Sequence, residues 1–171
     1  IVLQYSQLST LDNVIISGNQ GRGVDIERSG ASPVFNNVTI SNNVDGNGAG
    51  VRCQDQASPT FTNCVISNNT SSGGGSIYAE NSSFTMDSVT VSNNISTGSY
   101  GASINVMGTD ISDKHVRIFN SRISDNTTTG GSAAGIYIFR IDSVTIVSTE
   151  ILGNSGGNTG GLKIQSVNYF N

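Results

Sequence analysis

The sequence predicts an all-β chain of 171 residues wound as a solenoid, and three observations lead to that prediction. Gly, Ser, Asn and Thr make up close to half of the residues, and a four-residue pattern returns about every 25 residues. No apolar stripe with the 3.6-residue period of a helix occurs anywhere. So many turn residues and so few helix formers exclude a helical bundle.

The repeating pattern has four positions. The first is apolar, the second is usually Ser, the third varies, and the fourth is Asn. Six copies end in Asn, spaced by 24, 26, 25, 32 and 28 residues. These spacings suit one supersecondary unit per repeat. The six residues are Asn19, Asn43, Asn69, Asn94, Asn126 and Asn154.

Two further columns of apolar residues accompany this pattern in every repeat. One is an apolar-x-apolar triplet, whose period of two indicates a short strand with alternate side chains buried. The other lies five residues before the apolar residue of the repeating pattern. Each repeat is therefore expected to supply about three short strands. The triplets begin at Val24, Val51, Ile77, Ile104, Ile136 and Leu162, and the other column is Leu11, Phe35, Phe61, Met86, Ile118 and Ile146.

Successive strands without helices between them predict a chain that winds round and stacks on itself, so that like strands become parallel neighbours. We therefore expect a right-handed parallel β-helix of about six coils. A leucine-rich repeat is excluded because the chain has only five leucines. The Asn column is expected to form a ladder of stacked inward amides, and Asn also tolerates the left-handed backbone of a tight turn. Residues 1–171 are predicted to be one solenoid segment of a longer chain or assembly.

The chain resembles the superfamily of right-handed β-helices typified by pectate lyase, whose coils carry such asparagine ladders. Gly73-Gly74-Gly75-Ser76-Ile77-Tyr78 and Ala134-Gly135-Ile136-Tyr137 also resemble repeats of polymorphic outer-membrane adhesins and related surface proteins. The resemblance covers nearly the whole chain and implies the fold. It leaves the function open, because the superfamily includes lyases, hydrolases, adhesins and tail spikes.

Charge and motif content exclude several functions. A net charge of -4 with eight Lys and Arg argues against nucleic-acid binding, which needs a basic face. No apolar run approaches ~20 residues, so membrane insertion is not expected. Clusters of Cys or His, a P-loop and the common hydrolase motifs are absent from the sequence, and neither a metal nor another cofactor is expected.

Two cysteines and several N-glycosylation sequons raise two possible modifications of a secreted chain, a disulfide and N-linked glycans. Cys53 and Cys64 occupy inward columns of one coil, where they form either a disulfide or two buried thiols. Among the sequons, the ladder residues are expected to point inward, and the direction of Asn37 stays open. Asn68 and Asn81 are then the accessible glycosylation candidates.

The enzymatic alternative places a site on the outer face of the triplet strands, where enzymes of the resembling superfamily have theirs. Asp25, Glu27, Arg52 and Glu80 point outward there, with Glu27 and Glu80 two strands apart at roughly 9.6 Å. This separation is near the upper limit for the carboxylates of an inverting glycosidase, ~9.5 Å. However, the acidic pairs and basic motifs of the family's enzymes are missing. Asp25 and Arg52 would also be direct neighbours on adjacent strands, which is the arrangement of a surface ion pair. The single histidine, His115, lies in the longest insertion, which is either a site loop or a solvated loop.

Several apolar side chains are expected to point outward rather than into the core. Such a patch suggests a contact surface for protein or sugar, whereas scattered surface apolar residues need no function. The candidate residues are Tyr78, Met107, Tyr137, Phe139 and Phe119.

These features favour an extracellular or cell-surface structural or adhesive β-solenoid, and not an enzyme. It would be a rigid segment of a surface fibre, appendage or adhesin. Its expected partners are other copies or neighbouring subunits of a surface assembly, and glycans. The alternatives are a polysaccharide lyase or hydrolase and a β-helix that binds carbohydrate without turnover.

Overall fold

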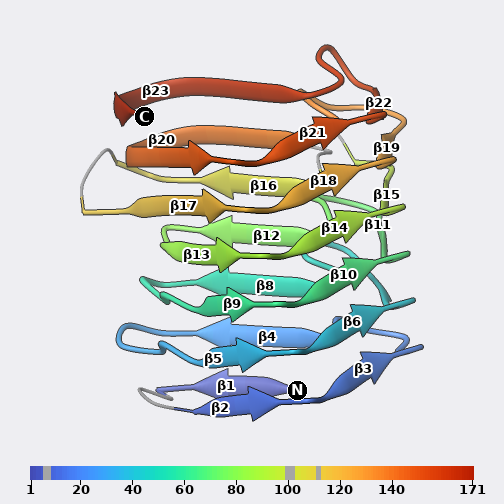
Figure 1. The fold of residues 1–171 in the computed structure, drawn as a ribbon, viewed down its shortest axis with the longest axis vertical. Coiled ribbons are helices and arrows are strands. Elements are labelled where there is room, and N and C mark those ends of the chain that lie inside the picture. Colours follow the sequence, from blue (N-terminus) through green and yellow to red (C-terminus); the bar gives the residue numbers. More distant parts are fainter. Residues whose placement is uncertain (6–8, 99–102, 111–112) are drawn as a thin grey trace.

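Short strands and tight turns alternate along the chain, and each coil lies on the one before it (Figure 1). The structure, a computed structural model, describes residues 1–5, 9–98, 103–110 and 113–171. Among these residues no helix occurs, and the strands pair in parallel with their equivalents in the neighbouring coils. Within the same residues, no segment forms a helix capable of crossing a membrane.

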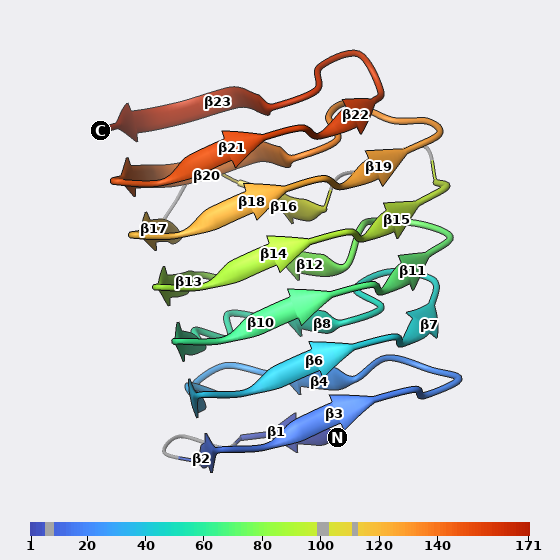
Figure 2. The same ribbon diagram turned by 45° about the vertical axis from the view of Figure 1, so that its right-hand side comes forward.

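Each coil has three main faces. The first face contains β1 (Val2–Gln4), β4 (Val24–Glu27), β8 (Val51–Gln54), β12 (Ile77–Glu80), β16 (Ile104–Met107) and the start of β20 (Ile136–Val147). The second contains β2 (Thr10–Asp12), β5 (Val34–Asn36), β9 (Thr60–Thr62), β13 (Phe84–Asp87), β17 (His115–Phe119) and the rest of β20. The third contains β3 (Ile15–Ser17), β6 (Thr39–Ser41), β10 (Val65–Ser67), β14 (Thr90–Ser92), β18 (Arg122–Ser124) and β21 (Glu150–Leu152), stacked as Figure 2 shows.

The predicted register of all three columns is confirmed. Ile66 pairs with Ile40 and Val91 on the third face, and Ile77 pairs with Val51 and Ile104 on the first. On the second face, Met86 pairs with Phe61 and Ile118. Equivalent residues therefore stack directly, as parallel in-register strands require.

The structure adds a fourth strand of two residues to most coils, just after the ladder asparagine. These strands are β7 (Val44–Asp45), β11 (Thr70–Ser71), β15 (Ile95–Ser96), β19 (Thr127–Thr128) and β22 (Ser155–Gly156). At the C-terminal end, β20 runs without a break across the corner between the first and second faces, and β23 (Leu162–Phe170) pairs along it. The prediction of about three strands per coil omitted these two-residue strands because their sequences have no alternation long enough to detect.

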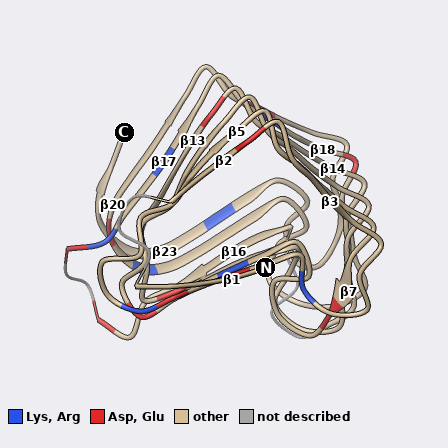
Figure 3. Ribbon diagram, turned by 90° about the horizontal axis from the view of Figure 1, so that it is seen from below, with Lys and Arg blue, Asp and Glu red and all other residues tan. Residues whose placement is uncertain are grey.

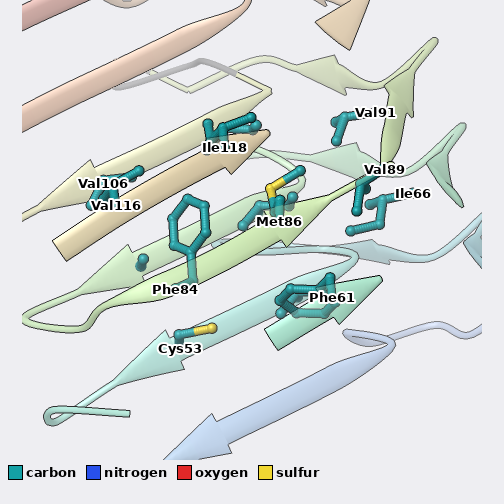
Figure 4. Close-up of a cluster of buried hydrophobic side chains, with 14 of the residues drawn as sticks. Cys53, Phe61, Ile66, Phe84, Met86, Val89, Val91, Val106, Val116 and Ile118 are labelled. Carbon is teal, nitrogen blue, oxygen red and sulfur yellow. The ribbon is translucent and has the colours of Figure 1, made fainter. Parts of the chain in front are cut away.

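Apolar side chains from the three main faces fill the inside of the coil. Phe35 and Phe61 stack with ring centroids 4.7 Å apart, and both are buried. Figure 4 shows how Phe61, Phe84 and Met86 continue this filling from one coil to the next. Because fully burying one such side chain contributes about 1.5–3 kcal/mol, this continuous column is the main source of stability.

The predicted asparagine ladder runs through the molecule as one chain of amide hydrogen bonds. Each Nδ2 donates to the Oδ1 of the next ladder asparagine, at 2.7 Å from Asn19 to Asn43, 3.0 Å to Asn69 and 3.1 Å to Asn94. The same bonds continue to Asn126 and Asn154. All members point inward, as expected, and the interior four are almost completely buried.

The left-handed backbone, however, does not fall on the ladder residues. It falls on the residue before each of them, which is Gly18, Asn42, Asn68, Asn93, Asp125 or Gly153, with φ between 56° and 71°. The ladder asparagines therefore act through their side-chain amides, and the preceding residue makes the turn.

Candidate functional site

Charged side chains on the outside of the first face form a compact ion-pair network. Arg52 donates from Nε and Nη2 to the two oxygens of Asp25, both at 2.7 Å, and from Nη2 to Oε1 of Glu27 at 2.5 Å. Arg22 Nη1 lies 3.0 Å from Asp25 Oδ2, and Gln4 Nε2 donates to the other oxygen of Glu27 at 2.6 Å. Figure 3 shows Lys and Arg lying next to Asp and Glu along this side of the coil.

This network occupies two of the three carboxylates of the predicted enzymatic site, Asp25 and Glu27. Asp25 is buried, with 7% of its surface exposed. Burial alone would lower the pKa of the Arg52 guanidinium, but the hydrogen bond to Asp25 and the charges of Asp25 and Glu27 outweigh it and raise the pKa. Glu80 is exposed and two strands from Glu27, with Gln54 between them. The arrangement is that of a structural clamp across neighbouring coils.

Two of the predicted outward aromatic residues are covered. Tyr78 and Tyr137 lie outside the main core cluster, as expected, but only 9% and 7% of their surfaces are exposed. A Cβ on Gly74 would lie 2.5 Å from Tyr78 Cδ2, so the turn containing Gly74 packs on that ring. Tyr137 packs against Ala133 and Phe139, and its hydroxyl donates to Gln165 Oε1 at 3.1 Å. The rings therefore point away from the core as expected, but they are covered, because the turns fold back over the first face.

The other members of the predicted contact patch are half-buried. Met107 and Phe139 are neighbours on the first face, and Phe119 lies on the second. The guanidinium of Arg140 stacks 4.9 Å from the centre of the Phe139 ring. The five residues therefore do not form one exposed apolar surface.

Both cysteines are free thiols in the structure, which agrees with the second of the two alternatives. Cys53 stacks between Ile26 and Ala79 on the first face. The thiol of Cys64 donates to the carbonyl oxygens of Thr62 and Phe35, at 3.2 and 3.4 Å. Burial raises the pKa of both thiols, so neither is an activated nucleophile.

The sequon asparagines divide by exposure much as the register predicts. Asn69, Asn94 and Asn126 are buried in the ladder, whereas Asn68 is exposed. Asn37, whose direction the sequence left open, is exposed at a corner with φ 53°. Asn81 is half-buried, and its Oδ1 accepts hydrogen bonds from the backbone N and Oγ1 of Thr109, at 2.6 and 2.9 Å.

A polar groove runs along the corner between the first and second faces, and sequence analysis did not find it. It consists of two adjoining hollows of about 420 and 440 Å³, which share Gln56, Asn81, Asp110 and Lys114. Tyr5, Arg28 and Asp55 line one end. The sequence feature that pointed to this groove was the insertion before His115, which enlarges the turn after β16. Residues 111 and 112 of that insertion lie outside the described part of the chain.

Three contacts order the side chains of the groove. Lys114 is largely buried and its Nζ lies 2.7 Å from Asp110 Oδ1. The guanidinium of Arg28 lies 5.2 Å from the centre of the Tyr5 ring, which is 65% exposed. The side chain of Gln56 accepts a hydrogen bond from Ser29 at 3.4 Å. Amides, charged groups and an aromatic ring are thus held around one open space.

His115, at the edge of the groove, does not form a catalytic triad. Its Nδ1 lies 2.7 Å from Ser143 Oγ and 3.9 Å from Asp142 Oδ2. In a triad the serine and the carboxylate contact opposite nitrogens of the ring, whereas here both face the same nitrogen. Among the described residues, no group of three His, Cys, Asp or Glu side chains is placed to hold a metal ion.

Comparison with known proteins agrees with this architecture. The family model described as right handed beta helix region matches residues 1–115. No curated protein and no solved structure matches the chain. The match covers the coils that carry the first four ladder asparagines and the ion-pair network. With its parallel coils and stacked asparagines, the chain belongs to the right-handed β-helix family.

Proposed function

We propose that this chain is a structural and adhesive β-solenoid that acts outside the cell or at its surface, as part of a fibre, appendage or adhesin. Hydrogen bonds join every coil to the next on all faces, and the asparagine ladder adds a buried connection along the axis. Such a stack resists bending because each coil is bonded to its neighbours. Its partners would be neighbouring subunits, including copies of itself, and glycans.

The observation that carries the proposal is the ion-pair network on the first face. A glycosidase needs one carboxylic acid that donates a proton and one carboxylate that is free to act on the sugar or on water. Asp25 and Glu27 instead share Arg52 at 2.5–2.7 Å, Arg22 also binds Oδ2 of Asp25, and Gln4 binds the second oxygen of Glu27. Groups engaged in this way favour a role in joining coils over a role in turnover.

A single experiment separates adhesion from catalysis. The purified chain is applied to surfaces coated with neutral and acidic polysaccharides and to intact cells of its source, and both retention and soluble sugar products are measured. Adhesion predicts retention without product. Release of product that is lost in Glu80→Gln or Glu27→Gln would overturn the proposal in favour of a lyase or hydrolase.

Surface location has its own measurement. Antibodies raised against the chain should label intact cells of the source, or the material that those cells shed, without permeabilisation. Labelling only after permeabilisation would contradict an extracellular role.

A further inference from the structure

The corner groove is a surface feature that neither the core nor the ladder explains. Its floor follows the same corner through consecutive coils, because Gln56 N donates to Asn81 O and Asn81 N donates to Met107 O. From Tyr5 in the first coil to Thr109 in the fifth, four steps of ~4.8 Å give a length of about 19 Å. Each of its two hollows, about 420 and 440 Å³, is within the range of ligand sites.

The groups in this groove suit a ligand with many hydroxyls. Asn81 uses Oδ1 to bind Thr109, and Gln56 uses Oε1 to bind Ser29. In these contacts both amides act as acceptors through oxygen, and the NH₂ group of each side chain carries two donors that a ligand hydroxyl can accept. Asp55 and Asp110 supply acceptors beside them. A sugar hydroxyl both donates and accepts, so neighbouring amides and carboxylates can bind it together.

The end of the groove has an aromatic platform. The Tyr5 ring is 65% exposed, and Arg28 stacks on it at 5.2 Å. An exposed ring with a polar edge gives a flat apolar surface next to hydrogen-bonding groups. That combination matches the apolar face and polar rim of a sugar ring.

The charge of the groove argues against an acidic ligand. Three carboxylates, of Asp55, Asp110 and Asp113, face two permanent cations, Arg28 and Lys114. Lys114 is already paired with Asp110 at 2.7 Å. A uronate or sulfate group would therefore meet a surplus of negative charge, and of the two cations only Arg28, which stacks on Tyr5, lies outside that ion pair.

We infer that the corner groove binds an uncharged oligosaccharide chain lying along the solenoid axis, with one sugar ring on Tyr5 and hydroxyls on Asn81 and Gln56. This inference rests on the proposed adhesive function and names the ligand class of its contact. Binding requires no covalent step.

The test uses cello-, xylo- and manno-oligosaccharides as neutral probes and oligogalacturonate as the acidic probe, by array and then by calorimetry. Asn81→Asp keeps the Oδ1 contact with Thr109 but removes both N–H donors. Tyr5→Asn removes the ring at a position with φ 54°, where Asn is tolerated. Each variant should weaken binding of the best neutral probe by about tenfold, the equivalent of about 1.4 kcal/mol.

Matched controls make the same changes away from the groove. Asn68→Asp alters an exposed asparagine with φ 56°, and Tyr169→Asn removes a tyrosine that is also 65% exposed. Neither should change binding, and circular dichroism should show all four variants folded. Variants that fail to fold are replaced by Gln56→Glu and Arg28→Gln, which test the same groove.

The outcomes separate this inference from the proposed function. Neutral binding that falls in the groove variants alone supports it. Preference for oligogalacturonate, binding to none of the probes, or equal binding by groove variants and controls would overturn it. In those cases, retention of the chain on cells or subunits would leave the adhesive function standing, whereas release of sugar product would overturn that function.

Discussion

Replacing Asn69 by Ala removes one rung from the middle of the asparagine ladder. The side chain donates to Ile40 O at 3.0 Å and to Asn94 Oδ1 at 3.1 Å, and accepts from the backbone N and Nδ2 of Asn43, both at 3.0 Å. These four hydrogen bonds use the whole capacity of the amide. Because Asn69 has no left-handed backbone, the change to Ala adds no backbone strain.

The expected loss of stability follows from those four bonds. At about 1 kcal/mol of net stability each, they contribute about 4 kcal/mol. The loss is larger if the two Asn43 donors find no water, since each buried unsatisfied group costs about 1–3 kcal/mol. Against a total stability of about 5–15 kcal/mol, this is a severe change.

Urea unfolding followed by circular dichroism measures the effect. With a urea m-value of about 2 kcal/mol/M, the midpoint should fall by about 2 M. Asn68→Gly, next in sequence but exposed, should change stability by less than about 1 kcal/mol. Asn19→Ala, at an exposed end of the ladder with one side-chain bond to Asn43 at 2.7 Å, should cost about 1 kcal/mol. If Asn69→Ala costs no more than Asn19→Ala, the buried hydrogen bonds of the ladder do not stabilise the fold.

Two further predictions concern the first face. Arg52→Met leaves the buried Asp25 without its bidentate partner and should lower the free energy of unfolding in urea by about 3 kcal/mol. Adding Asp25→Asn to this variant should recover most of the loss. If it recovers nothing, the two residues act independently. Burial raises the pKa of the Cys53 thiol above its unfolded value, so its contribution to stability is complete below about pH 8.5 and declines as pH rises, by about 1.4 kcal/mol per unit. Comparing unfolding of the wild type and Cys53→Ala between pH 8 and pH 10.5 isolates this slope, and parallel pH profiles would contradict it.

The sequence predicted the inside of this molecule in detail. Ile40, Ile66 and Val91 were aligned from spacing alone, and the structure pairs them directly. This succeeded because a parallel solenoid stacks each residue on its equivalent one repeat away, so sequence period and spatial register are the same quantity. The ladder followed for the same reason, since each inward amide lies between its own copies in the neighbouring coils and binds them as well as the nearby backbone.

The outside was less predictable, because it depends on turns that do not repeat. Tyr78 points outward as expected, but the turn containing Gly74 covers it, which the repeat did not predict. The two alternatives for Cys53 and Cys64 could not be separated from spacing, since a disulfide depends on distances that only the folded coil sets. Asn37 and Asn81 likewise differ in exposure although both lie at corners.

The sequence by itself determined the coil, its register and the asparagine ladder, because periodic residues in parallel strands leave one stacking that buries every apolar column. Only the tertiary structure decided which outward groups meet each other. It added Glu27 and Arg22 to the Asp25–Arg52 pair that the register had placed together, and it brought Tyr5, Gln56, Asn81 and Lys114 from separate coils to one groove. Those neighbours are set by the lengths and backbone angles of individual turns, which follow no period.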